Sequence, residues 1–184
     1  MEHLKEDLKT RHTPKVVAEL MMKKAKEYIN PYKVIRFLEP SAGVGILVDE
    51  FQNYMSETKG AYVINTCELQ RENESVLVEK GYGRCLYADF LEMPENMTFD
   101  LILANPPFTN YQELTHIKKM LKHLDKDGTL VTLCSSAVDF REDRQYTHFR
   151  NEILPMATDV QDLPEGAFRS SGTNVRMKML TFRG

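Results

Sequence analysis

Apolar residues fall in short blocks along the chain, and their spacing changes from block to block. Residues 34–39, 61–69 and 84–88 are short apolar runs typical of β-strands. In residues 44–56 and 71–80, apolar positions recur every three or four residues, which indicates helices with one buried face. The first half of the chain therefore predicts strands that alternate with helices.

The second half continues this pattern and then changes. Residues 99–104 form a nearly continuous apolar strand, residues 111–124 have helical spacing, and residues 128–135 form another strand after a glycine turn. Two extended runs, 157–163 and 174–182, indicate a terminal hairpin. Because strands that alternate with helices form parallel sheets covered on both faces, the pattern predicts an α/β fold with seven, mostly parallel strands and an antiparallel hairpin.

A length of 184 residues fits one domain with a single core. Within this domain, 1–184, we expect three parts. Residues 1–33 are a helical lead-in, residues 34–136 are the ligand-binding core, and residues 137–184 are a polar segment followed by the hairpin.

Composition and charge exclude several classes of protein. Hydrophobic residues make up 42% and charged residues 28% of the chain, which is typical of a folded globular protein. Apolar runs are far shorter than the roughly 20 residues of a membrane span, and no secretory signal is evident, so we expect no membrane partner and a cytoplasmic protein. A net charge of −3 offers no general attraction to nucleic acid, although the segments that flank residues 34–140 are more basic. Cys67, Cys85 and Cys134 lack metal-ligand spacing and are expected to be buried free thiols, so we expect no metal site.

The loops after the predicted strands carry the candidate chemistry, because ligands of open α/β sheets bind at the carboxyl ends of the strands. Residues 39–45 contain Gly43 and Gly45 between a strand and a helix, where glycines let the backbone approach a ligand closely. Glu68 ends the next strand, where an acid commonly binds ribose hydroxyls. These two features fit both NAD and a nucleoside-containing methyl donor.

The loop after the fourth strand separates these two possibilities. Asn105 is followed by Pro106 and Pro107, which stiffen the backbone and can hold the Asn oxygen and a neighbouring carbonyl as two preorganised acceptors. Two acceptors suit a planar NH₂ group, and Phe108 offers an aromatic face for a flat heterocycle. Such a site would catalyse transfer by orienting the amino group towards an electrophilic methyl.

With these motifs the chain resembles the Rossmann-like S-adenosylmethionine-dependent amino-methyltransferases, especially the DNA adenine-N6 group with its Asn/Asp-Pro-Pro-Tyr/Phe tetrapeptide. The resemblance implies S-adenosylmethionine as cofactor and nucleic acid as partner, with DNA favoured over RNA. It implies that Asn105 and the Pro106 carbonyl hold the target amino group while Phe108 stacks on the base. The residues that the resemblance assigns to the cofactor are Thr13, Pro14, Glu39, Pro40, Ala42, Gly43, Gly45, Glu68, Asp89, Phe90 and Asn105.

Residues 163–168, followed by Ser171, Gly172 and Thr173, also resemble the closing segment of several adenine methyltransferases. The chain departs from sequence-specific members in one respect. Only about a dozen polar residues after Ser136 stand where a large recognition region is usual. Arg141, Arg144, Tyr146, His148 and Arg150 could contact phosphates and bases, or form a solvated helix. The resemblance therefore leaves room for a separate specificity subunit.

Four alternatives stay open at this point. An RNA adenine-N6 methyltransferase would use the same tetrapeptide, and a protein-glutamine methyltransferase shares Asn-Pro-Pro but generally carries an added helical domain. A noncatalytic subunit of a methyltransferase complex would keep the fold without turnover. An NAD oxidoreductase fits least, because the residues Asn105–Phe108 have no evident role in hydride transfer and the glycine spacing is not GxGxxG.

Overall fold

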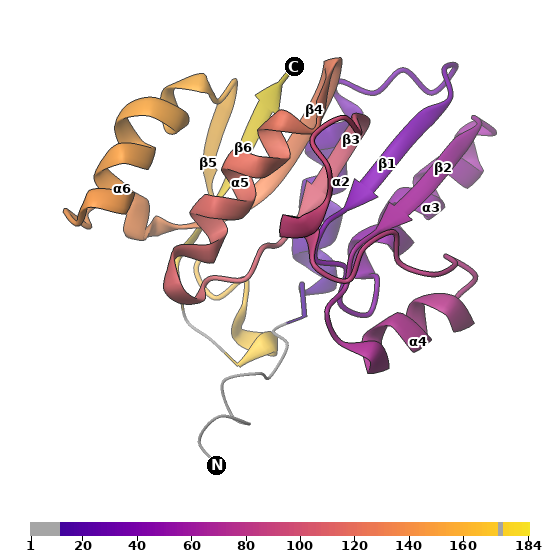
Figure 1. Ribbon diagram of the computed structural model, residues 1–184, viewed down its shortest axis with the longest axis horizontal. Helices are drawn as coiled ribbons and strands as arrows, with labels where there is room; N and C mark the ends of the chain where they lie inside the picture. Colours follow the sequence, from indigo (N-terminus) through magenta and orange to yellow (C-terminus); the bar gives the residue numbers. More distant parts are fainter. Residues whose placement is uncertain (1–11, 173–174) are drawn as a thin grey trace.

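The computed structural model describes residues 12–172 and 175–184, and its centre is a mixed β-sheet (Figure 1). The strands are β1 (Ile35–Glu39), β2 (Tyr62–Thr66), β3 (Phe99–Ala104), β4 (Leu124–Ser135), β5 (Asp159–Asp162) and β6 (Met177–Arg183). They lie in the order β2-β1-β3-β4-β6-β5. The first four pair in parallel, whereas β6 runs antiparallel to both β4 and β5.

Helices cover both faces of this sheet. The α-helices are α2 (Lys15–Lys26), α3 (Ile46–Thr58), α4 (Arg71–Glu79), α5 (Gln112–Lys122) and α6 (Arg144–His148). Shorter 3₁₀ turns are Phe90–Glu92, Thr109–Tyr111, Ser136–Asp139, Leu154–Met156 and Arg169–Ser171, and a π-helical turn is Phe149–Ile153. In Figure 1, α5 lies in front of the sheet while α2 and α3 lie behind it.

Alternating strand residues supply the two cores. Phe37 and Leu101 point to the face covered by α2 and α3, where Phe37 stacks on Phe51 at a centroid distance of 4.2 Å. Their chain neighbours Leu38 and Ile102 point to the opposite face, which is covered by α5. Since both faces are buried, the strands are continuously apolar, as parallel strands in covered sheets generally are.

The sheet has six strands and not the predicted seven. Residues 84–88 run beside β2 but make only one isolated bridge, between Tyr87 and Cys67. None of the five residues is buried, and Gly83 before them has a φ of +82°. A segment without a buried face gains little from continuous pairing, so residues 84–88 form an irregular edge.

Other elements follow the predictions with shifted ends. The parallel pairing of the first four strands and the terminal hairpin are confirmed. Strand β5 lies inside the predicted run 157–163, and β6 overlaps the predicted run 174–182 and ends one residue beyond it. The predicted turn before residue 128 is part of β4, where the pairing with β3 shifts register. Residues 1–11 of the predicted lead-in, Thr173 of the closing motif and Asn174 of the last run lie outside the described residues.

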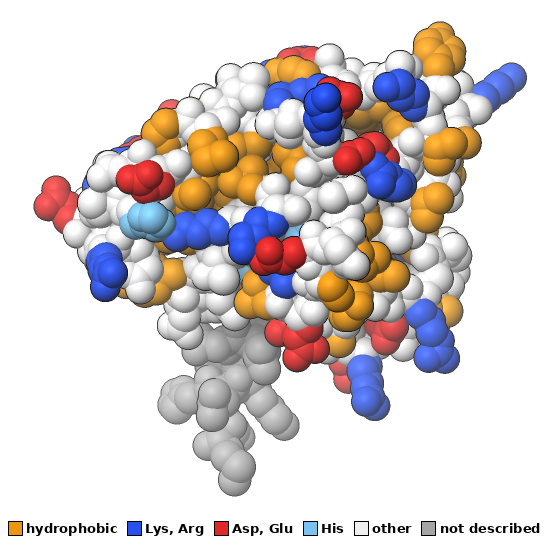
Figure 2. Space-filling view, turned by 45° about the horizontal axis from the view of Figure 1, so that its top comes forward, with side chains coloured by type: hydrophobic (Ala, Val, Ile, Leu, Met, Phe, Trp, Pro, Cys, Tyr) orange, Lys and Arg blue, Asp and Glu red, His pale blue; other side chains and the backbone are white. Residues whose placement is uncertain are grey.

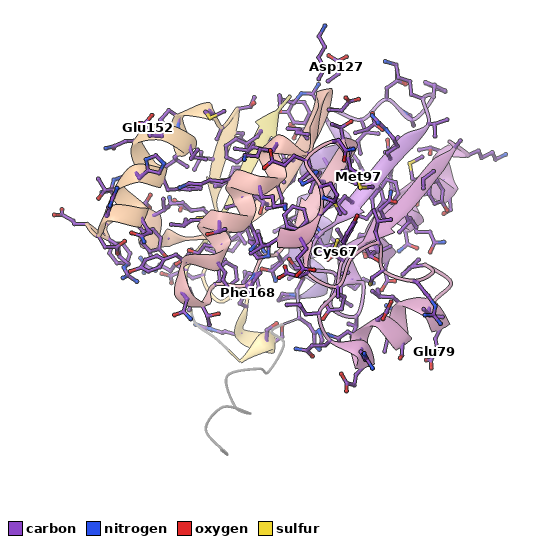
Figure 3. All side chains as sticks on the ribbon, in the orientation of Figure 1. Cys67, Glu79, Met97, Asp127, Glu152 and Phe168 are labelled. Carbon is purple, nitrogen blue, oxygen red and sulfur yellow. The ribbon has the colours of Figure 1, made fainter. Side chains whose placement is uncertain are left out.

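The carboxyl ends of β1, β2 and β3 meet at the lower edge of the sheet in Figure 1. Figure 3 places Cys67 and Phe168 towards this edge and Asp127 at the opposite end. On the face shown in Figure 2, acidic, basic and hydrophobic side chains are interspersed, so the described residues give this face no field of a single sign. Every helix in the described part of the chain is too short or too polar to cross a bilayer.

Candidate functional site

The loop after β1 is a tight turn in which the two glycines have different tasks. Gly43 and Gly45 have φ angles of +52° and +81°, which strain any side-chain-bearing residue. A Cβ at Gly45 would lie 2.7 Å from Leu77 of α4, so this glycine permits close packing. A Cβ at Gly43 would find its nearest neighbour, the His12 ring, at 3.7 Å, an ordinary van der Waals distance, so Gly43 is not closely packed. The turn thus leaves a backbone surface that a ligand can approach.

Glu68 fastens this turn to the loop after β2. One carboxylate oxygen accepts the Gly43 amide at 2.7 Å, and the other accepts the Gln70 amide at 2.8 Å and the Asn73 side chain at 3.2 Å. The backbones also pair, since the Ala42 amide donates to the Cys67 carbonyl. A carboxylate has about four acceptor sites, so Glu68 keeps capacity for a ligand while it holds the Gly43 backbone.

Glu39, the last residue of β1, is only 2% exposed. Burial raises the pKa of this carboxyl well above its usual range, while a hydrogen bond with the Val48 backbone lowers it and the nearby Glu68 raises it. Its Oε2 atom and the Ser41 hydroxyl are buried and have no hydrogen-bond partner among the described residues. Unpaired buried polar atoms are costly, so this part of the edge has the character of a polar ligand site.

Asp89 and Phe90 follow shortly after the bridge between Tyr87 and Cys67, and they have different surroundings. The Asp89 carboxylate accepts the Leu91 amide at 2.8 Å and caps the short helix Phe90–Glu92. The Phe90 ring is 2% exposed and packs against His116 and His123. The Phe90 ring is therefore part of the core, and a contact of Phe90 with the cofactor stays a prediction.

Asn105 follows β3 and meets a residue from the other end of the chain. Its Nδ2 donates to the Thr13 hydroxyl at 3.0 Å, across 92 positions of sequence. Its Oδ1 is buried and has no partner in the described part of the chain. The amide is held by its nitrogen and presents its oxygen as a free acceptor.

The closing segment, residues 163–172, packs around the same point. Phe168 is buried in the core behind the sheet, and Phe108, Leu163 and Ala167 pack against that core. Ser171 donates its hydroxyl to the His12 carbonyl at 2.7 Å. Pro14, which is buried, directly follows Thr13 and is the N-cap residue of α2. The tetrapeptide, the Thr-Pro pair and the closing segment, three separate sequence predictions, therefore lie together.

A cluster of four side chains beside the tetrapeptide was missed by the sequence analysis. Arg141 lies over the rings of Tyr111 and Tyr146, 5.3 and 5.0 Å from their centroids, and donates to the Tyr111 hydroxyl. Tyr146 donates its hydroxyl at 2.8 Å to Glu113, whose side chain is fully buried. Burial raises the pKa of Glu113 to about 7, against the lowering effect of the hydrogen bond from Tyr146. The partners are about 30 residues apart, so no local spacing signals this cluster.

The link from the tetrapeptide to α5 is also unusual. Asn110 and Tyr111 both have positive φ, 51° and 61°, which costs energy in residues other than glycine. Tyr111 is held in this conformation by its contacts with Arg141 and Tyr146. The cluster therefore supports a strained turn directly after the candidate acceptor residues.

The polar segment that could contact nucleic acid divides into buried and exposed side chains. Tyr146 is buried on Glu113, and Arg150 donates to the carbonyls of Val138 and Arg141. Arg141, Arg144 and His148 are exposed. A contact of these residues with nucleic acid stays a prediction.

The cysteines and the titratable clusters do not form a metal site in residues 12–172 and 175–184. Cys67 and Cys134 are buried, and Cys85 is partly buried outside any strand. Burial raises the pKa of Cys67 to about 12, so this thiol stays protonated.

No protein-family model and no curated protein sequence matches the chain. Its fold matches the methyltransferase subunit of a type I restriction-modification system from Streptococcus thermophilus, with a TM-score of 0.77 and 18% identity, over 94% of this chain and 44% of that one. A proposed class I S-adenosylmethionine-dependent methyltransferase from Listeria monocytogenes gives a TM-score of 0.71 and 14% identity, over 96% of this chain and 61% of that one. A geranyl diphosphate methyltransferase in complex with S-adenosylmethionine gives a TM-score of 0.61 and 12% identity, over 92% of this chain and 84% of that one.

These matches establish the class of fold. The chain has the α/β Rossmann-like methyltransferase fold, with a mixed sheet of six strands. It spans less than two thirds of the length of the Streptococcus and Listeria proteins.

Proposed function

We propose that this protein is an S-adenosylmethionine-dependent methyltransferase that transfers a methyl group to the N6 amino group of adenine in DNA. The observation that carries the proposal is the buried, unpaired Oδ1 of Asn105 at the carboxyl end of β3. A buried acceptor without a donor is expected where a substrate N–H completes the hydrogen bond.

The residues around the β1 loop fit the cofactor. Glu39 Oε2 and the Ser41 hydroxyl are buried polar groups without a partner among the described residues, and the loose packing around Gly43 leaves room near its backbone. Pro40, Ala42 and the two glycines would surround the methionine and ribose parts, Glu68 would take the ribose hydroxyls, and Asp89 would meet the adenine. When bound, S-adenosylmethionine supplies an electrophilic methyl group on a cationic sulfur. Nearby carboxylates favour such a cation.

Asn105 and the Pro106 carbonyl would act on the acceptor. Each accepts one N–H of the amino group, so the nitrogen lone pair is directed out of the plane of the base. Proline at positions 106 and 107 fixes φ and holds both acceptors before the substrate arrives. Phe108, which is partly buried against the core, offers a ring beside them. Positioning and electrostatics would supply the rate enhancement.

Two observations support adenine in DNA as the acceptor. The ring of Phe108 suits a stacked base. The closing segment, which resembles that of adenine methyltransferases, lies at the same site, because Ser171 donates to the carbonyl of His12 beside Thr13. The described polar segment after β4 is small, and two of its side chains, Tyr146 and Arg150, are already bonded to Glu113 and to the Val138 carbonyl. We therefore propose that target choice relies on a separate specificity subunit.

The test is a panel of acceptors incubated with tritiated S-adenosylmethionine. Duplex DNA, single-stranded DNA, RNA and a glutamine-containing protein are compared, and each nucleic acid is paired with a strand in which guanine replaces adenine. The proposal expects label in adenine-containing DNA and none in its adenine-free partner. Label only in protein, or equal label in both strands of a pair, would refute it.

A further inference from the structure

We propose that Thr13 is a positioning residue that orients the side-chain amide of Asn105, so that the amide oxygen faces the acceptor amino group. This inference rests on the proposed function. It assigns Thr13 a role that differs from the cofactor contact implied by family resemblance.

The first support is the direction of the hydrogen bond. Asn105 Nδ2 donates to Thr13 Oγ1 at 3.0 Å, and Asn105 Oδ1 is left buried and unpaired among the described residues. The reverse orientation would direct two donor hydrogens at the incoming N–H, and two donors repel each other. A partner that takes the Nδ2 hydrogen therefore keeps the oxygen available.

The second support is the rigidity of the Thr13 position. Pro14, which directly follows Thr13, is the N-cap residue of α2 with a φ of −59°, and Val17 and Ala18 in the first turn of α2 are fully buried. On the other side, the His12 carbonyl accepts the Ser171 hydroxyl at 2.7 Å. Thr13 therefore lies between the buried N-terminus of α2 and a residue that is bonded to the closing segment, so its hydroxyl is a preorganised partner.

The third support is that Asn105 lacks another anchor. Pro106 follows it directly and has no backbone N–H to donate. Among the described residues, the Asn105 side chain makes one hydrogen bond, the bond to Thr13. Loss of that bond frees the amide to rotate.

The test compares Thr13→Val, which keeps the shape and removes the hydroxyl, with Thr13→Ser, which keeps the hydroxyl. Thr58→Val, at the far end of α3, is the matched control. At saturating cofactor, Thr13→Val should lower kcat about tenfold, the value of one hydrogen bond, while the Kd for S-adenosylhomocysteine stays unchanged. Thr13→Ser should restore kcat. A weaker Kd with unchanged kcat would overturn the proposal, because Thr13 would then be a cofactor contact only.

Two further readouts separate orientation from general loss of structure. In the N105D background both side-chain oxygens are acceptors, so the orientation of the side chain matters less. Thr13→Val should then lower kcat by roughly threefold or less. In ¹H–¹⁵N spectra of the cofactor-free protein, the Asn105 NH₂ signals should shift and exchange faster in Thr13→Val and return in Thr13→Ser. Unchanged NH₂ signals would overturn the inference. If the wild-type protein methylates no acceptor, the proposed function fails, and the spectra still decide the role of Thr13.

Discussion

At the carboxyl ends of β1 and β2, polar groups are joined mainly by backbone amides, whereas at the ends of β3 and β4 they are joined by side chains from distant segments. On the β1–β2 side, formed by residues 39–45, 67–73 and 89–91, Glu68 accepts two backbone amides and Asp89 accepts one. On the β3–β4 side, formed by residues 105–113 and 139–146, the ties are Asn105 to Thr13 and Tyr146 to Glu113.

This difference suits two tasks. A turn held through its backbone keeps one shape whatever side chains surround it, which is appropriate for a cofactor that every turnover uses. Side chains that cross between segments can set the direction of a single acceptor atom. We therefore expect substitutions on the two sides to have separable effects, on cofactor affinity and on transfer.

The largest effect should come from Gly45→Ala on the β1–β2 side. The new Cβ would meet Leu77 at 2.7 Å in a backbone with φ of +81°, so the free energy of unfolding should fall by about 3–4 kcal/mol. Gly43→Ala has room for its Cβ and should lower the free energy of unfolding by only about 1–2 kcal/mol, yet it should weaken cofactor binding. Urea unfolding and titration with S-adenosylhomocysteine measure the two quantities. If both variants lowered the free energy of unfolding equally, Gly45 would not differ from Gly43 in how closely it is packed.

The next largest effect is the pH dependence of stability that arises from Glu113, the buried acid on the β3–β4 side. Folding raises the pKa of Glu113 from 4.5 to about 7, so the folded state holds the proton more tightly than the unfolded state. Glu113 therefore contributes stability that is present below about pH 4.5 and is lost as pH rises through 7. Relative to Glu113→Gln, the wild-type free energy of unfolding should fall by about 3 kcal/mol between pH 4.5 and pH 8.

Unfolding of both proteins across this pH range provides the measurement. The difference between them isolates Glu113 from Glu39, whose pKa is also raised by burial, and from His116 and His123, whose pKa values are lowered by burial. A difference that does not change with pH would show that Glu113 is ionised in the folded protein.

A smaller effect should follow from Glu68→Gln. The amide keeps one acceptor oxygen but turns a donor towards the Gly43 or Gln70 amide, so the glycine turn loses a charge-assisted bond worth about 2 kcal/mol. The Kd for S-adenosylhomocysteine should rise roughly tenfold or more. Glu72→Gln, on the exposed surface of α4, is the control and should leave the Kd unchanged. Equal Kd values for the two variants would remove Glu68 from the cofactor site.

Local patterns were sufficient for the strand–helix order, because alternation and glycine turns depend on neighbouring residues. Strand β3 has the predicted ends, 99–104. The seventh strand was predicted wrongly, since residues 84–88 look apolar in sequence but have no buried face.

Contacts between distant segments lay beyond local patterns. The tetrapeptide was found through its own residues, but the bond from Asn105 to Thr13 depends on how α2 packs behind β3. The cluster of Tyr111, Arg141, Tyr146 and Glu113 likewise needs the end of β4 to lie beside the start of α5. Such partners become visible only when the topology brings them together.

The most direct test of the central claim is Asn105→Ala, with transfer rate and cofactor affinity measured on the same preparation. We expect the single-turnover rate to fall on the order of 100- to 1,000-fold, as for other lost positioning hydrogen bonds. The Kd for S-adenosylhomocysteine should stay within about twofold of the wild-type value, because the glycine turn and Glu68 are untouched. A rate close to that of the wild-type protein, with cofactor binding intact, would contradict the account.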